Sequence, residues 1–379
     1  MVFTKNKKIE NLLLFSYLLV FPFGQLFRIS ILNASDFIVA LTFLYVLGTT
    51  KNFSKIFKIF TPFILVAGSS LIFSIFIFKI SLTGTGFLYF LRLVIYWYFL
   101  QFCFNFAHNR QKIKELLFSS LMILTVAVAV FGWFQYFVYP DLTALKYLGW
   151  DDHLFRLVGT FLDPGFTGLI IVLGVIITYF KKNWWLFFFL ILSLAFTYSR
   201  AGYLALIFSL LAIAVITKKF KLVILSTLFF LVVTLFLPKS GGQGVNLART
   251  YSISARFENY RETLTIFNQS PVFGIGFNNF CLARQFYLHK TDLSSHSCSG
   301  SDSSLLLILA TTGMVGFLVF ISCLLNLYQL PARGLYFKVL IISGVALLAH
   351  SLFVNSLFYP WLMGYFVILL SIQDFKEKS

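Results

Sequence analysis

Long apolar runs alternate with short polar connections along almost the whole chain. The runs are roughly 17 to 24 residues long, which lets a helix cross the ~30 Å hydrocarbon core of a bilayer. This pattern predicts an all-α fold, a polytopic membrane helix bundle of about 12 transmembrane helices, in a single integral membrane domain over residues 1–379. The predicted spans are 10–27, 31–48, 58–78, 86–106, 115–139, 159–180, 183–198, 201–217, 221–237, 304–328, 335–352 and 355–372.

The composition excludes a soluble domain. Hydrophobic residues make up 59% of the chain and charged residues only 11%, whereas a soluble domain carries roughly 25% charged residues. The chain also contains 50 phenylalanines, which suit a lipid environment and would promote aggregation in water.

The basic residues indicate how the helices are oriented. If the N-terminus is cytoplasmic, every inner segment carries at least two lysines or arginines, and the short outer connections carry fewer. Lys and Arg are enriched on the cytoplasmic side of membrane proteins. We therefore predict a multi-pass protein of the cytoplasmic membrane with both termini cytoplasmic. This topology explains the net charge of +17, and no nucleic-acid partner is needed to account for it.

Two of the outer connections are long. The shorter outer loop covers residues 140–158, and a large extracytoplasmic loop covers residues 238–303, between the ninth and tenth helices. The large loop contains nearly all of the only long polar stretch, which runs from Arg249 to Ser304 and holds four arginines, two histidines and two cysteines. We expect the helices to hold this stretch over a cavity at one membrane face.

The first part of this stretch, residues 249–268, predicts an amphipathic helix. Arg249 and Arg256 flank its apolar stripe on one side, and Arg261 flanks it on the other. A helix of this kind lies on the membrane with its arginines at the level of the headgroups. It is either an anchor for anionic lipid or a binding element for a lipid diphosphate. The stripe consists of Ile253, Phe257, Tyr260, Leu264 and Phe267.

The segment that follows predicts a turn and two candidate bases. Gly274 and Gly276 permit positive φ and a close backbone approach, but no P-loop lysine accompanies them, so we do not assign a nucleotide site. His296 and Asp302 are candidate general bases, although a loop histidine is more often ordinary than catalytic and an acid that begins a helix is commonly an N-cap.

The cysteines do not have the spacing of a metal site, and we predict no metal ligands and no cofactor. Cys281 and Cys298 share the polar loop and could pair if that loop faces an oxidising compartment.

Further candidates lie outside the large loop. Arg200 stands between two apolar runs, either as an interfacial anchor or as a phosphate-binding guanidinium. Arg92 lies within a span and needs a partner or a wet cavity, and Asp36 is one possible partner. Asp163 begins a span either as an ordinary N-cap or at a broken helix entry. With Arg156 of the shorter loop, Asp163 and Arg92 are the candidate cavity-lining residues.

The order of these pieces resembles the O-antigen ligase/polymerase superfamily. The sequence SRAGYLAL is followed by the outer loop with its arginine-bearing helix, then PVFGIGFNNF, then a polar residue about eleven positions before the glycine of ATTGMVG. Members are integral membrane glycosyltransferases that act on undecaprenyl-diphosphate-linked glycans. The resemblance covers roughly residues 155–330. It implies that Arg200 and Arg256 bind the diphosphate, and that the partners are a polyprenyl-diphosphate-linked glycan donor, a glycan acceptor and membrane lipid.

One position departs from the family pattern. Ligases of this family place His-Asn where the last helix leaves the loop, and this chain has Asp302-Ser303, with His296 six residues upstream. The resemblance therefore favours polymerase-like members, and the base stays open between Asp302 and His296. The implied reaction is metal-independent glycan transfer. A transporter or flippase for lipid-linked glycan and a non-catalytic scaffold are the alternatives.

Overall fold

The computed structural model describes residues 7–29, 31–78, 83–148, 152–238, 243–292, 298, 300–330 and 334–374. These parts of the chain are almost entirely helical. The exception is a short antiparallel hairpin of β1 (Arg28–Ile29) and β2 (Leu32–Asn33) that precedes the second helix. The expected all-α, membrane-type architecture is confirmed.

Every predicted span contains an apolar helix. Among the described residues, six helices are long and apolar enough to cross a membrane: Lys7–Leu26 (α1 Lys7–Val20 with the 3-10 helix η1 Phe21–Leu26), α3 Lys55–Ile77, α4 Gly84–Ala107, α5 Gln111–Val138, α8 Arg200–Thr217 and α12 Ser304–Tyr328. Six others have 10–17 residues: α2 Ala34–Thr49, α6 Pro164–Phe180, α7 Trp184–Ala195, α9 Phe220–Leu235, α13 Leu335–Ser351 and α14 Pro360–Ser371. The protein is a multi-pass membrane protein, and the count of twelve spans remains a prediction.

Helix α6 begins later than the apolar pattern suggests. The run predicted to start at 159 opens with a 3-10 turn, η4 (Gly159–Phe161), followed by Leu162 at a φ of 55°. The helix then begins at Pro164 with Asp163 as its N-cap. A fixed φ near −65° and a missing N–H suit proline to the first turn of a helix. Both expectations for Asp163 are therefore met, because it caps a helix whose entry is broken.

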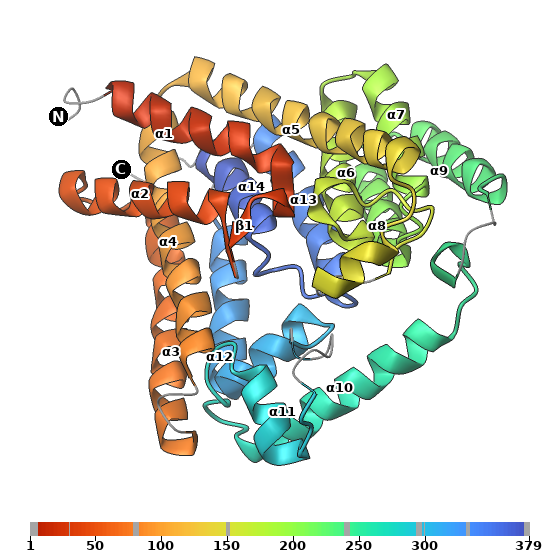
Figure 1. Cartoon of the computed structure of the whole chain (residues 1–379). Helices are drawn as coiled ribbons and strands as arrows, with labels where there is room; N and C mark the ends of the chain where they lie inside the picture. The colour runs from red at the N-terminus through yellow and green to blue at the C-terminus, as the bar shows by residue number, and fades with distance from the viewer. Residues whose placement is uncertain are drawn as a thin grey trace.

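Helix α6 is also the centre of the bundle. Its residues from Thr167 to Tyr179 are buried on every side, as expected for a helix surrounded by other helices. It packs against α5, α7, α8 and α13, and α13 packs in turn against α8. On the other side of the molecule, α3 and α4 run side by side with α12 and α14 packed against them (Figure 1).

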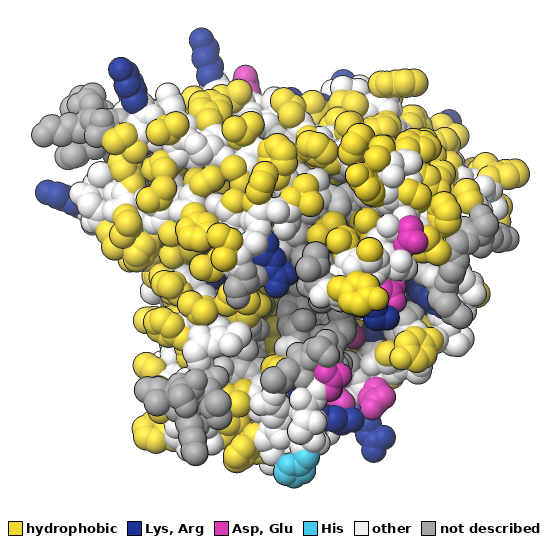
Figure 2. All heavy atoms as spheres, in the orientation of Figure 1, with side chains coloured by type: hydrophobic (Ala, Val, Ile, Leu, Met, Phe, Trp, Pro, Cys, Tyr) yellow, Lys and Arg dark blue, Asp and Glu magenta, His cyan; other side chains and the backbone are white. Residues whose placement is uncertain are grey.

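Two α-helices lie in the large loop: α10 (Tyr251–Gln269) and α11 (Phe280–Leu288). They lie across the lower side of the view in Figure 1, where both contact α12. Most acidic side chains seen on this face gather in the same lower-right region, whereas hydrophobic side chains cover the helices above it (Figure 2). The predicted helix over 249–268 is thus confirmed, beginning two residues later.

The face that α10 buries is polar. Asn259, Thr263 and Ile266 are its buried residues, at spacings of four and three. On the predicted apolar stripe, Phe257 is 67% exposed and Leu264 is 45% exposed. The helix therefore docks through Asn259, Thr263 and Ile266 and leaves Phe257 and Leu264 exposed. Exposed apolar side chains of this kind are expected where a helix lies on a membrane.

The glycine turn after α10 docks into a break in α12. Gly313 interrupts that helix with a φ of 69° and a ψ of −173°. The N–H groups of Ile275 and Gly276 donate to the carbonyls of Ala310 and Thr311 at 3.1 and 3.0 Å. The predicted positive φ is present at Gly274, at 73°, and the close approach it permits is to helix α12.

Candidate functional site

Arg200 is the first residue of α8, and two neighbouring contacts fix its position. Ser199 is the N-cap, and its hydroxyl accepts the N–H of Gly202 at 3.1 Å. Arg156 donates from Nε to the carbonyl of Thr197 at 3.0 Å and from a terminal nitrogen to that of Tyr198 at 3.3 Å. Arg156 was expected to line a cavity. It is buried, and its contacts hold the turn that carries Arg200.

The guanidinium of Arg200 reaches across to the start of α10. One terminal nitrogen donates to the carbonyl of Arg249 at 2.9 Å, and the other donates to the hydroxyl of Ser252. Arg249 itself donates to the carbonyls of Gly244 and Asn246 at 2.7 and 2.9 Å. The loop before α10 is thereby attached to the beginning of α8.

Arg256 joins these two arginines to form a cluster of three positive charges. Burial lowers the pKa of Arg249, and the charges of Arg200 and Arg256 lower it further. Within the described residues, no carboxylate forms an ion pair with Arg200, Arg249 or Arg256. We call these residues the arginine cluster. Like charges without a counter-charge raise the energy of the free protein, and an anion would relieve that repulsion.

Tyr260 connects the arginine cluster with Asp302. Burial raises the pKa of Tyr260, the charge of Asp302 raises it further, and the charge of Arg256 lowers it. Its hydroxyl donates to the carbonyl of Leu352, just beyond α13, at 2.6 Å. Arg256 and Tyr260 are four residues apart on α10 and therefore share one face. That face is turned toward Asp302.

Asp302 is held through its backbone. Its N–H donates to Oδ1 of Asn259 at 2.8 Å, and the hydroxyls of Thr263 and Ser301 lie 3.1 Å apart. The N-cap of α12 is Ser303, whose hydroxyl accepts from Leu306. The N-cap explanation of Asp302 is therefore wrong: its side chain lies one residue before the cap and is not needed for capping.

A polar network continues from this point into the bundle. The hydroxyl of Ser304 accepts the N–H of Ser356 at 2.8 Å. Nδ1 of His350 lies 2.6 Å from the Ser356 hydroxyl, and its Nε2 lies 3.1 Å from the carbonyl of Gly165. Gly165 donates its own N–H to Asp163 at 2.6 Å. The contacts thus link the start of α12, the segment after α13 and the start of α6.

The sequence reasoning missed His350, Asn259 and Ser252. His350 ends an apolar run, and an ionisable residue at such a place is by itself a signal of a special role. Asn259 could have been noticed with Thr263 as a second, polar face of the amphipathic helix. Ser252 carries no signal in the sequence, because only the fold brings it to Arg200.

The remaining expected residues lie elsewhere. Arg92 pairs with Asp36, its terminal nitrogen 2.7 Å from Oδ2, and both side chains are buried. The proposed partner is thus confirmed, and Arg92 supports the bundle. Arg261 is exposed and lines a surface depression with Glu258, Glu262 and Lys290, apart from the arginine cluster. His296 lies outside the described residues.

A disulfide and two ion pairs hold the large loop together. Cys281 is bonded to Cys298, as the sequence allowed. Glu262 of α10 pairs with Arg284 of α11 at 2.8 Å and with Lys290 at 3.8 Å. The pair with Arg284 fixes α11 against α10, and the disulfide joins α11 to the later part of the loop at Cys298. Among the described residues, no group of three or more His, Cys, Asp or Glu side chains is placed to hold a metal ion.

Comparison with known proteins identifies the family. Residues 185–321 match the family model of O-antigen ligase. This match supports membership of the O-antigen ligase/polymerase superfamily. The matched part of the chain runs from α7 into α12 and includes the arginine cluster, Asn259 and Asp302. His350, Asp163, Arg156 and Arg92 lie outside it. No curated protein matches the chain.

The matched family indicates the broad class of activity. O-antigen ligases act on lipid-linked glycans in membranes, which supports glycan transfer, a glycan substrate and membrane lipid in general terms.

Proposed function

We propose that this protein joins lipid-linked glycan repeat units at the outer face of the cytoplasmic membrane, as an O-antigen polymerase does. It moves a glycan from a polyprenyl diphosphate to a hydroxyl of a second glycan. The observation that carries this proposal is the arginine cluster, in which Arg200, Arg249 and Arg256 meet without a carboxylate partner among the described residues.

A diphosphate suits the arginine cluster in both charge and geometry. Guanidinium groups bind phosphate oxygens with pairs of parallel hydrogen bonds, which a lysine ammonium does not provide. The three arginines come from the start of α8, the loop before α10 and the first turns of α10. An anion bound among them would connect the bundle to the large loop, so substrate binding and closure of the site would be coupled.

The proposed reaction is a single displacement. The hydroxyl oxygen of the acceptor glycan attacks the anomeric carbon, and the bond from that carbon to the diphosphate oxygen breaks. The bonding electrons leave with the diphosphate, whose growing negative charge the arginines stabilise. Asp302 takes the hydroxyl proton as general base, a role typically worth 10²–10⁴-fold in rate. We expect this chemistry to need no metal ion and to persist in EDTA.

The position of Asp302 supports this assignment. Asp302 precedes the N-cap of α12, and its backbone N–H donates to Oδ1 of Asn259 at 2.8 Å. The charges of Asp302 and Arg256 both act on the pKa of Tyr260. A carboxylate next to the diphosphate site is where the acceptor hydroxyl must lose its proton. His296 is the competing candidate base.

The disulfide supports action at the outer face. Bonded cysteines persist in oxidising compartments and are rare in the cytosol, and Cys281–Cys298 lies in the large loop. The distribution of basic residues independently gives the same orientation. A polymerase is favoured over a ligase because Asp302 stands where the family's ligases carry histidine.

Polymer profiling tests the proposal. A host that supplies one defined lipid-linked repeat unit would express the wild type, Arg256→Ala, Asp302→Asn or His296→Ala. A ladder of lengths that collapses to single units in Arg256→Ala and Asp302→Asn is the expected result. Single units moved intact to another acceptor would instead identify a ligase. Glycan that crosses the membrane with no new bond would overturn the proposal in favour of a transporter.

A further inference from the structure

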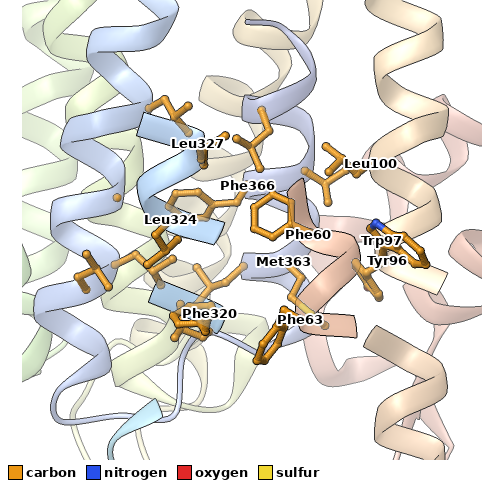
Figure 3. A pocket seen from close by; sticks show the side chains of 18 of the residues that line it. Phe60, Phe63, Tyr96, Trp97, Leu100, Phe320, Leu324, Leu327, Met363 and Phe366 are labelled. Carbon is orange, nitrogen blue, oxygen red and sulfur yellow. The ribbon is translucent and has the colours of Figure 1, made fainter. Parts of the chain in front are cut away.

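A large apolar cavity lies outside the polar site. It has a volume of about 380 Å³ and is enclosed by α3, α4, α12, α13 and α14. The side chains of Phe60, Phe63, Phe320 and Phe366 lie around it together with Met363 (Figure 3). Every lining residue is aliphatic, aromatic, methionine or glycine. No charged side chain among the described residues lines this cavity, so a hydrocarbon chain suits it better than a charged headgroup does.

The cavity is elongated along the helices. Its lining includes Phe337 near the start of α13 and Leu348 near its end, which at 1.5 Å per residue are about 16 Å apart. That distance is about half of the ~30 Å hydrocarbon core. Tyr328 is 65% exposed and Leu348 is 39% exposed, so the lining reaches the protein surface. A chain can therefore enter sideways from the membrane.

One end of the cavity adjoins the candidate site. Leu357 and Phe358 line that end, and the N–H of Leu357 donates to the hydroxyl of Ser304 at 3.2 Å. Ser304 begins α12, two residues after Asp302. A lipid whose chain fills the cavity would emerge beside the residues that hold Asp302.

We propose that this cavity binds the polyisoprenoid chain of a lipid-linked glycan substrate. This inference rests on the proposed function and adds to it the place where the lipid is held. The many aromatic rings of the lining offer broad faces to a chain that carries a double bond and a methyl branch in every isoprene unit. Only the end of the cavity at Leu357 and Phe358 adjoins the residues that hold Asp302, and this sets the direction in which the chain lies.

Gly344 is a suitable position for a substitution that fills the cavity. It lines the cavity, and a Cβ added there meets no heavy atom within 4 Å. A leucine at this position therefore extends into the open space without a backbone clash. Gly48 in α2 is the matched control, because its Cβ also meets nothing within 4 Å and it does not line the cavity. Both substitutions replace a helical glycine with a better helix former.

The first experiment measures transfer from two donors with the same glycan diphosphate, one on a long and one on a short prenyl chain. The wild type and Gly48→Leu should prefer the long-chain donor in kcat/KM. Gly344→Leu should lose about tenfold of that preference, equivalent to about 1.4 kcal/mol, with the short-chain donor little changed. Val345→Phe is a second filling variant if Gly344→Leu does not fold. An unchanged preference in a folded filling variant would overturn the inference.

The second experiment does not depend on catalysis. The purified protein in nanodiscs is labelled with a polyprenyl diphosphate that carries a photoreactive group at the far end of its chain. Label should appear on α13 and α14 in the wild type and fall in Gly344→Leu. If excess phosphatidylglycerol removes the label as well as unlabelled polyprenyl phosphate does, the cavity binds bulk lipid and the inference is wrong. If labelling succeeds while no glycosidic bond forms, the proposed function fails and the lipid site stands.

Discussion

Oδ1 of Asn259 accepts the backbone N–H of Asp302 at 2.8 Å, across 43 residues of sequence. Asn259 lies between Arg256 and Tyr260 in sequence and on the buried side of α10. One helix therefore carries an arginine toward the proposed diphosphate and fixes the backbone of the proposed base. The relative positions of the arginine and the proposed base depend on the docking of α10, so a change in that docking should affect both residues.

Arg256→Ala should reduce glycan transfer by about 10²–10³-fold, because one of the charges that stabilise the leaving diphosphate is lost. Arg200→Ala should have a similar effect and should also loosen the loop before α10, since its bonds to Arg249 and Ser252 disappear. Arg256→Lys should recover only part of the rate. Turnover with purified protein measures this, and Arg110→Ala, at the start of α5, is the control that should behave as wild type. Wild-type turnover in Arg256→Ala would contradict the diphosphate role.

Asp302→Asn should lower kcat by about 10²–10⁴-fold with little change in KM, because the amide keeps the size of the side chain and loses its basicity. Its melting temperature should match the wild type, since the bond to Asn259 uses the backbone of residue 302. Asn259→Ala should lower both the melting temperature and the rate. If His296→Ala collapses activity while Asp302→Asn does not, the base is His296.

Gly313→Ala should destabilise the protein by about 1–3 kcal/mol or more. The φ of 69° is unfavourable for alanine, and the new Cβ would lie 2.2 Å from the carbonyl oxygen of Val272, a backbone atom. Gly274→Ala faces the same problem against Thr311, at 2.4 Å. Thermal unfolding in detergent measures the effect. Gly48→Ala, with open space around it, should be neutral or slightly stabilising.

Loss of the Cys281–Cys298 disulfide should destabilise the large loop by about 3 kcal/mol, the value expected for a closed loop of this size. Reduction of the wild type and the double serine variant should lower the melting temperature equally. In Cys298→Ser, the freed Cys281 should react in intact cells with a maleimide that does not cross membranes. Reaction only after the cells are opened would place the loop in the cytosol and contradict the proposed orientation.

Tyr260→Phe should cost about 0.5–1.5 kcal/mol, because the carbonyl of Leu352 loses its donor. The pKa of Tyr260 is raised in the folded protein, above all by burial. The unfolded tyrosine ionises near pH 10, so the stability due to Tyr260 is complete below that pH and falls as the pH rises toward the folded pKa. Thermal unfolding at increasing alkaline pH should show a smaller decline for Tyr260→Phe. Parallel declines would show that Tyr260 does not titrate in this way.

The pattern of apolar and polar residues is enough to predict the helices, the glycine turn and one buried ion pair. Apolar runs of spanning length predict the twelve apolar helices because a backbone in hydrocarbon must satisfy its own hydrogen bonds. The glycines of the turn predict positive φ for a local steric reason. The pairing of Arg92 with Asp36 could be suggested because a lone charge in a span is costly.

Which polar residues meet depends on how distant helices pack. Arg256 joins Arg200 and Arg249, and Arg261 does not, because α10 docks through Asn259 and Thr263 rather than through its apolar stripe. His350 reaches Gly165 across 185 residues because α13 packs on α6. Such contacts depend on how helices rotate and cross, and those rotations are fixed by side-chain packing between distant segments. The local periodicity of the sequence does not specify these rotations.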